Sequence, residues 1–193
     1  MENNFDMGGM HVELFLPPEQ ATKKVIIPEL SHGSNIVTVR LGNEDVNSCD
    51  ALITENRNVS LGIKTADCAP VCFSDGRKIG IAHIGWRGLC LGLIEKMLAR
   101  FDAAVLSVYV APFLHSFEIQ KDSCYDRITQ KFGEHFFEQR DEKLFFNFKD
   151  AIASLLPSQT AFDPRDTTTD LSLPSYRRNK TNDRFVAVVS FSP

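Results

Sequence analysis

Residues 65–88 read TADCAPVCFSDGRKIGIAHIGWRG, and this stretch holds two apolar runs, 69–73 and 78–83, on either side of a turn signal. The turn signal is Ser-Asp-Gly, which favours a tight loop between two short strands. Antiparallel pairing of the runs would place their outer ends side by side. Cys68 precedes the first run and His83 ends the second. The hairpin is therefore predicted to bring a thiol and an imidazole together.

The segments that flank the hairpin extend this pattern. Gly85 and Gly88 stand on each side of a bulky pair, as a sharp turn beside a ligand requires, and helical spacing then predicts a helix over 89–100. Upstream, His32 precedes a glycine and the β-branched run 36–39, so it also stands near a strand end. Two imidazoles and one thiolate suit a zinc ion with an open fourth position, which is the arrangement of a catalytic site.

The rest of the chain mixes short strands with a few helices. The predicted strands cover 24–27, 35–40, 51–54, 59–64, 107–110 and 184–191, and the predicted helices cover 123–137 and 146–156. The chain has 193 residues, a single-domain size, and shows no internal repeat or linker. The sequence therefore predicts one α+β domain over 1–193.

The composition is that of an ordinary globular protein, with 24% charged and 43% hydrophobic residues. The net charge of −4 argues against a binder of duplex nucleic acid. A basic cluster near the end of the chain either binds an anion or forms a solvated turn. Its members are Arg177, Arg178, Lys180 and Arg184.

The expected location is the cytoplasm. No apolar run approaches the roughly 20 residues of a membrane span, and the first residues lack the pattern of a signal peptide. The five cysteines are odd in number and scattered, unlike the framework of a small secreted domain. We therefore expect reduced thiols and no membrane partner.

Several motifs together resemble the YfiH or laccase-domain family, once labelled multicopper polyphenol oxidases. They are TADCAPV, HIGWRG, the upstream HG, CDALIT, and SYRRNKTNDR near the end, and the resemblance covers roughly 30–191. It implies a mixed-sheet sandwich flanked by helices, similar to certain glutamine-deamidating, CNF-like toxins. It also implies purine nucleoside phosphorylase and adenosine deaminase activity, with zinc held by His32, Cys68 and His83. Relatives usually carry a longer N-terminal region, so the resemblance leads us to expect a shortened N-terminal region in this domain.

The resemblance and the residue chemistry suggest further roles in the site. Asp67, next to Cys68, could orient a ligand or the substrate from behind the metal. Arg87 is the candidate for anchoring phosphate or the leaving base, because a guanidinium binds oxyanions in a bidentate fork, and Arg177 is the second candidate. Glu118 reads as an exposed strand glutamate rather than a catalytic group.

The expected substrates are adenosine, inosine or methylthioadenosine together with phosphate, and the expected assembly is a monomer or a homodimer. Zinc would lower the pKa of bound water to about 7, which suits attack at C6 of adenine with release of ammonia.

Three alternatives remain open from the sequence. The first is a cysteine hydrolase or amidase that uses Cys68 and His83, with a peptidoglycan precursor as its substrate. The second is a copper polyphenol oxidase, because two His and one Cys also suit copper. The third is a zinc-binding protein without catalysis.

Overall fold

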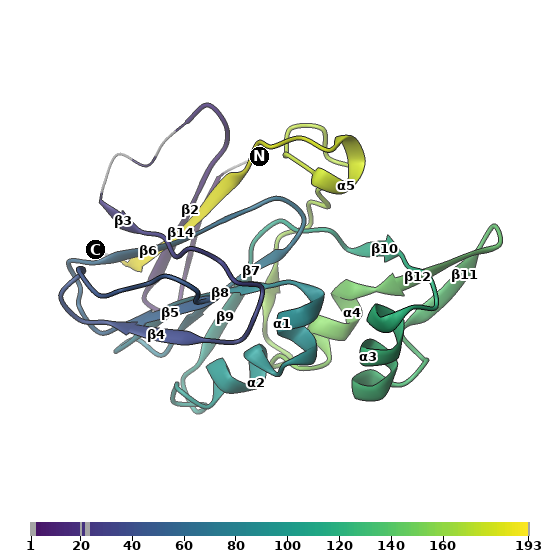
Figure 1. Ribbon diagram of the computed structural model, residues 1–193. Coiled ribbons are helices and arrows are strands. Elements are labelled where there is room, and N and C mark those ends of the chain that lie inside the picture. Colours follow the sequence, from purple (N-terminus) through teal and green to yellow (C-terminus); the bar gives the residue numbers. More distant parts are fainter. Residues whose placement is uncertain (1–2, 20, 22–23, 193) are drawn as a thin grey trace.

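The computed structural model describes residues 3–19, 21 and 24–192, so the extreme ends of the predicted domain 1–193 lie outside the described part. A six-stranded mixed sheet forms the centre of the molecule, in the order β13-β9-β7-β8-β5-β4 (Figure 1). The pairs β4–β5 and β13–β9 are parallel, and the other neighbours are antiparallel. These strands are β4 (Ile36–Val39), β5 (Ala51–Thr54), β7 (Ala69–Ser74), β8 (Ile79–Ile84), β9 (Ser107–Val110) and β13 (Ala161–Phe162).

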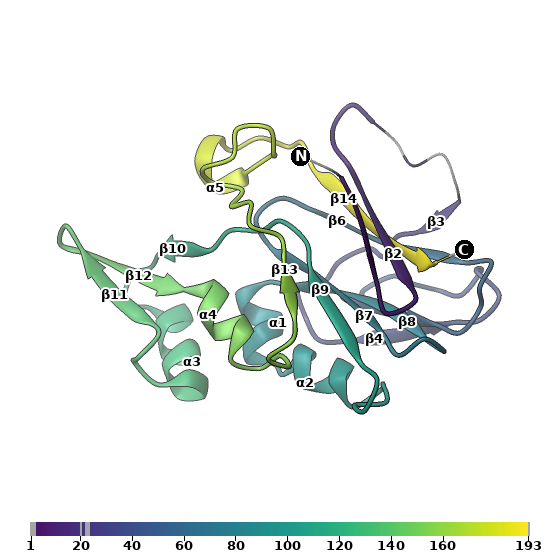
Figure 2. The ribbon, with the colours of Figure 1, turned by 180° about the vertical axis from the view of Figure 1, so that it is seen from behind.

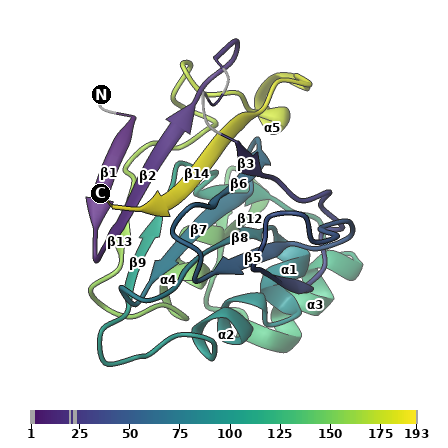
Figure 3. The same cartoon turned by 90° about the vertical axis from the view of Figure 1, so that its left-hand side faces the viewer.

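A five-stranded sheet covers one face of the central sheet (Figure 3). Its order is β1-β2-β14-β6-β3, so the last strand of the chain lies between strands from the first third. These strands are β1 (Asn4–Met7), β2 (Met10–Phe15), β3 (Val25–Ile26), β6 (Ser60–Thr65) and β14 (Phe185–Phe191). This sheet forms only when the two ends of the chain meet.

Side-chain alternation along the central strands builds two cores. On β5, Leu52 packs with the five-stranded sheet, whereas its neighbour Ile53 packs with the helices. On β7, Cys72 and Val71 divide in the same way. Successive side chains of a strand point to opposite faces, so continuously apolar strands can be buried on both sides. The predicted α+β sandwich flanked by helices is confirmed, and Figure 2 shows it from behind.

Helices cover the other face of the central sheet. They are α1 (Trp86–Cys90), α2 (Leu93–Leu98), α3 (Ser123–Phe132) and α4 (Phe148–Ala153). The prediction of one helix over 89–100 is wrong, because Gly92 takes a φ of 77° and separates α1 from α2. Gly133, with a φ of 74°, likewise ends α3 before the predicted residue 137. In the part of the chain that the structure describes, no helix has the length and apolar character needed to cross a membrane.

A small sheet and a short helix complete the fold. The sheet has the order β10-β12-β11 and projects beside α3 and α4 (Figure 1). Its strands are β10 (Ser116–Glu118), β11 (Phe137–Arg140) and β12 (Lys143–Asn147). The short helix α5 (Tyr176–Asn179) stands above β10 and precedes β14.

The predicted hairpin is confirmed. Strands β7 and β8 pair in antiparallel fashion, with Ala69 opposite Ile84. The Asp75 carboxylate accepts hydrogen bonds from the N–H groups of Lys78 (2.7 Å) and Arg77 (3.0 Å), which fixes the turn. This register places the residue before β7 and the end of β8 at the same edge of the sheet.

A buried ion pair ties the N-terminal hairpin to the central sheet. The Arg165 guanidinium donates to both carboxylate oxygens of Asp163, at 2.7 and 2.9 Å. The Tyr109 hydroxyl donates to the same carboxylate at 3.0 Å, and Phe5 of β1 stacks on the Tyr109 ring with 4.1 Å between ring centres. Arg165 also donates to the Asn3 side chain at 3.2 Å. One buried ion pair therefore holds together segments that are far apart in the sequence.

Candidate functional site

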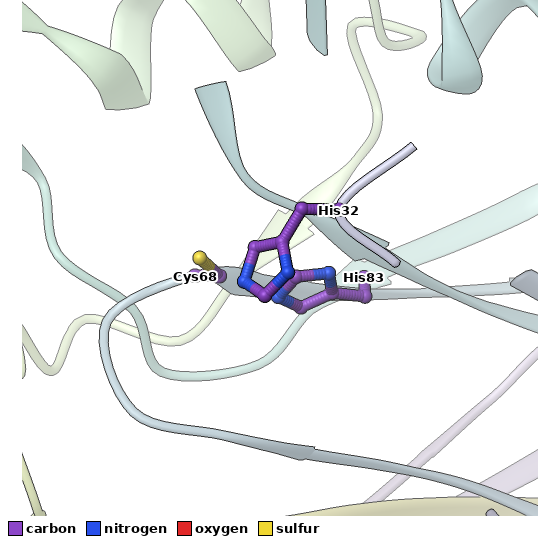
Figure 4. A group of neighbouring side chains, drawn as sticks. All are labelled: His32, Cys68 and His83. Atoms are coloured by element: carbon purple, nitrogen blue, oxygen red, sulfur yellow. The ribbon is translucent and has the colours of Figure 1, made fainter. Parts of the chain in front are cut away.

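Three metal-competent side chains meet at one end of the β7–β8 hairpin (Figure 4). Cys68 directly precedes β7, His83 lies in β8, and His32 lies in the loop before β4. Each offers a ligand atom, and these atoms all lie within 4.8 Å of one another. His32 has a left-handed backbone with a φ of 55°. This conformation is energetically unfavourable for a residue other than glycine, and residues that adopt it are often found at functional sites. The structure thus brings together the three residues that the sequence suggests as zinc ligands.

The space between these side chains depends on Gly85. A Cβ atom at this position would lie 3.2 Å from Cys68 Sγ, 3.9 Å from His83 Cε1 and 4.0 Å from His32 Cδ2. The two imidazole rings stand edge to face with 4.9 Å between their centres. The glycine keeps open a gap lined by one sulfur and two imidazoles. This donor set fits zinc, which binds thiolate and imidazole ligands readily.

Asp50 supports this group, and sequence reasoning missed it. The residue is fully buried, and one carboxylate oxygen lies 3.3 Å from His83 Nδ1. The other oxygen accepts hydrogen bonds from the Ser31 hydroxyl (2.6 Å) and from the Gly33 N–H (2.7 Å), on either side of His32. Asp50 therefore links two of the three candidate ligands. The available signal was a carboxylate directly before an apolar strand, inside the CDALIT motif.

Asp50 shifts the charge of its neighbours, so His83 is protonated at pH 7 in the metal-free protein and a bound metal would have to displace that proton. Burial raises the pKa of Asp50, but hydrogen bonds from His83, Ser31 and Gly33 outweigh it and hold the pKa at about 2. Burial lowers the pKa of His83, whereas interactions with Asp50 and Cys68 raise it to about 9. Because Nδ1 of His83 faces a carboxylate, Nε2 is left for a metal, as in carboxylate–histidine–zinc arrangements.

The pKa of His32 is shifted the other way. Burial lowers it first, and the nearby positive charges of His83 and Arg87 lower it further, although Asp50 opposes them. A lowered pKa keeps the imidazole neutral at pH 7, and the neutral form is the one that binds a metal.

Replacing Asp50 by asparagine is expected to weaken zinc binding by about 10- to 100-fold, because the His83 ring loses its charged partner. The measurement is a competition titration of zinc against a coloured chelator. Asp75→Asn is the matched control, because Asp75 is a largely buried carboxylate at the other end of the same hairpin. Zinc affinity that stays at the wild-type value in Asp50→Asn would contradict this role.

In the described part of the chain, the hydrogen bonds of the Asp67 side chain go to residues 167–177 rather than to the three candidate ligands. This side chain is buried, and one oxygen accepts hydrogen bonds from the hydroxyls of Thr167 (2.7 Å) and Ser175 (2.6 Å). The other oxygen accepts from the N–H of Arg177 at 2.7 Å. The contacts of Asp67 therefore lead to the segment 167–177, and it is Asp50 that contacts a candidate ligand.

A pocket of about 540 Å³ opens over the three candidate ligands. Its size lies within the usual range for small-molecule sites. It is lined by Leu30, His32, Lys64, Thr65, Ala66, Asp67, Cys68, His83, Gly85, Trp86, Leu114, Phe117, Phe148, Tyr176, Arg177, Lys180 and Arg184. The lining therefore combines metal-competent, aromatic and basic side chains.

The basic cluster predicted near the end of the chain divides into two roles. Arg177, Lys180 and Arg184 line the pocket. Arg178 instead donates to the carbonyls of Thr167, Asp170 and Leu173, at 2.6, 3.0 and 2.7 Å. These bonds fold the loop that precedes α5, so Arg178 acts in structure.

Arg87 lies outside this pocket. Its guanidinium stands 5.2 Å from the centre of the Trp86 ring and lines a neighbouring pocket with Arg127 and Lys131. Trp86 lines both pockets. Of the residues suggested for phosphate, the structure places Arg177 in the pocket and Arg87 beside it.

Glu118, which the sequence suggests is an exposed strand residue, forms an exposed ion pair with Lys143 at 2.9 Å.

Comparisons with known proteins give a consistent picture. The model of the family described as multi-copper polyphenol oxidoreductase laccase matches residues 14–192. A protein of Aquifex aeolicus named purine nucleoside phosphorylase is 30% identical over 175 residues, 86% of this chain and 82% of that protein. The Escherichia coli protein named purine nucleoside phosphorylase YfiH is 26% identical and aligns over 93% of this chain and 80% of its own length.

Solved structures show the same fold. A crystal structure of a Neisseria meningitidis protein superposes with a TM-score of 0.83 at 17% identity and covers 100% of both chains. The hypothetical protein YfiH of Bacillus licheniformis gives a TM-score of 0.77 at 21% identity, over 89% of this chain and 76% of that one. At these identities the likeness concerns the fold.

Proposed function

This chain belongs to the multi-copper polyphenol oxidoreductase laccase family, and from this premise we propose that it is a zinc-dependent purine nucleoside phosphorylase. One observation carries the proposal: a single pocket holds the His32–Cys68–His83 group together with aromatic and basic side chains. A purine nucleoside needs apolar surfaces for its base, and phosphate needs positive charge.

In phosphorolysis a phosphate oxygen bonds to C1′ of the ribose while the bond from C1′ to N9 of the purine breaks. The electron pair of that bond leaves with the base, which takes up a proton, and the sugar passes through a cationic, oxocarbenium-like transition state. Trp86, Phe117 and Tyr176 offer flat surfaces for the base. The basic side chains hold the phosphate dianion, so both reactants are bound in one pocket.

His32, Cys68 and His83 would hold the metal, and zinc bound there would supply a Lewis acid next to the substrate. We propose zinc rather than copper because two imidazoles and one thiolate beside an open pocket match a catalytic zinc site, which keeps its fourth position free. Zinc has no visible absorption band, whereas a blue copper centre absorbs strongly. A colourless protein that contains zinc is therefore the expected result.

Adenosine deaminase activity is a second reaction that we propose for the same pocket. Water adds to C6 of adenosine, ammonia leaves, and inosine forms. Both reactions start from a bound purine nucleoside, so adenosine, inosine and methylthioadenosine are the substrates to compare.

The geometry also favours a second candidate function, a cysteine amidase. Cys68, His83 and Asp50 follow one another as a thiol, an imidazole and a carboxylate, which is the order of a nucleophile, its base and the group that orients the base. Alkylation of the Cys68 thiol distinguishes the two. If Cys68 is a zinc ligand, added zinc slows its reaction with iodoacetamide; if Cys68 acts as a free nucleophile, zinc has no effect.

The proposal predicts phosphate-dependent cleavage. Each nucleoside is incubated with the untagged protein, with and without phosphate, and the products are separated by chromatography. We expect the free base and ribose 1-phosphate to form together and only when phosphate is present, since phosphate is the attacking group and becomes part of the sugar product. Inosine from adenosine without phosphate would support the deaminase reaction alone. Absence of both products would overturn the proposal.

A further inference from the structure

We propose that the basic side of the pocket is its phosphate site and that Asp67 positions it. We name as the basic wall the side chains of Lys64, Arg177, Lys180 and Arg184. This inference rests on the proposed function for the identity of the anion. Among the described residues, the basic wall and the residues that support it make no hydrogen bond with His32, Cys68 or His83.

The charge of the lining favours an anion. Besides the basic wall, the pocket lining holds one carboxylate, that of Asp67. Its two oxygens accept three hydrogen bonds within the protein and face the segment 167–177. The four cations are therefore not neutralised by acidic side chains of the lining. A dianion such as phosphate is the ligand that such a surface attracts.

Arg177 is the best-placed member of the wall. Its guanidinium carbon lies 4.5 Å from the centre of the Phe117 ring, and Nη1 donates to the carbonyl oxygen of Glu118 at 3.3 Å. These contacts fix the plane of the guanidinium and use one of its five N–H donors. Among the described residues, no carboxylate pairs with Arg177. The remaining donors can bind phosphate oxygens in a bidentate manner.

The other two cations near the C-terminus gather around Tyr176. Lys180 Nζ lies 4.8 Å from the centre of the Tyr176 ring, and the Arg184 guanidinium lies 5.9 Å from it. Lys180 adopts a left-handed backbone with a φ of 56° directly after α5, which turns the chain back toward the pocket. Lys64 comes from β6, so the wall joins two distant parts of the sequence.

Asp67 holds the part of the basic wall that carries Arg177. It accepts from the Arg177 N–H directly, and it accepts from the hydroxyl of Ser175, which is fully buried. The Ser175 hydroxyl oxygen in turn accepts from the N–H of Arg178 at 3.1 Å and caps α5. Asp67 directly precedes Cys68 in the sequence. The turn before β7 therefore carries a candidate metal ligand and, next to it, the aspartate that contacts the segment of Arg177.

Two aspartates thus have separate positioning roles. Asp50 contacts His83, and Asp67 contacts the segment that carries Arg177. Asparagine at position 67 keeps the size of the side chain but replaces one acceptor oxygen by an N–H₂ group, so it cannot accept from both directions. The Asp67→Asn change should therefore displace the basic wall and leave the arrangement of His32, Cys68 and His83 unchanged.

The test measures phosphate binding by calorimetry without nucleoside, and separately kcat, the KM for phosphate, the KM for nucleoside and the zinc content. Arg177→Gln is expected to weaken phosphate binding and raise the KM for phosphate by about 10- to 100-fold, because a charge-assisted bidentate contact is lost. Asp67→Asn should change both in the same direction by a smaller factor, with zinc content unchanged. Arg127→Gln, an exposed arginine of the neighbouring pocket, is the control and should match wild type.

The outcomes separate this inference from the proposed function. Phosphorolysis with an unchanged KM for phosphate in both Arg177→Gln and Asp67→Asn would overturn the inference and leave the function standing. A raised KM for phosphate in Arg87→Gln with none in Arg177→Gln would also overturn it. Phosphate binding that depends on Arg177 in a protein that cleaves no nucleoside would support the site and reject the function. If Asp67→Asn does not fold by circular dichroism, Arg177→Gln alone decides.

Discussion

Replacing His83 by alanine is expected to remove bound zinc and phosphorolysis together. His83 is 2% exposed and is one of the three side chains whose ligand atoms lie within 4.8 Å of one another. Loss of an outer partner of a metal ligand already costs about 10- to 100-fold in affinity, and loss of the ligand itself should cost more. Elemental analysis and initial rates on the same sample measure both effects.

Two further variants make this result specific. His135→Ala, an exposed histidine near the end of α3, should keep wild-type zinc and activity. Cys68→His removes the thiol but offers another zinc ligand. If this variant still binds zinc and keeps part of the wild-type activity, the result would support the metal role of Cys68. A metal-free His83→Ala protein with full activity would contradict it.

Replacing Arg165 by alanine is expected to lower the free energy of unfolding by about 3–5 kcal/mol, because it leaves the Asp163 carboxylate buried without its cation. The two side chains are 6% and 7% exposed, and Arg165 donates to both oxygens of Asp163. The change also frees the Asn3 side chain from its contact with Arg165. Denaturation by guanidinium chloride, followed by tryptophan fluorescence, measures the loss.

The control for this prediction is a surface ion pair. Arg140 lies next to Glu138, and both side chains are about half exposed, at 44% and 55%. Exposed pairs of this kind contribute little to stability, so Arg140→Ala should unfold at the wild-type denaturant concentration. Equal midpoints for Arg165→Ala and Arg140→Ala would contradict the structural role of the buried pair.

The sequence predicted what local pattern and residue chemistry determine. The β7–β8 hairpin follows from two apolar runs and a turn signal, and the candidate ligands follow from residue types beside strand ends and from the family motifs. The break at Gly92 was missed, because apolar spacing continues through it while its backbone conformation does not. Helical periodicity cannot show a left-handed residue in advance.

The supporting contacts could not be predicted, because they join distant segments. Asp67 accepts hydrogen bonds from residues 100 to 110 positions away, and β14 pairs with β2 and β6 across most of the chain. Asp50 reaches His83 over 33 positions. Each of these contacts arises only when strands or loops that are distant in the sequence come together in the fold. The residue type suggested that Asp67 was important, and the structure shows the segment on which it acts.

The central claim is that the metal held by His32, Cys68 and His83 is required for nucleoside cleavage. The most direct test removes metal from the protein with a chelator and titrates zinc back while phosphorolysis is measured. Activity should rise in proportion to bound zinc and stop rising at about one zinc per chain, as one three-ligand site requires. Full activity in the metal-free protein would contradict the claim and leave Cys68 as a nucleophile.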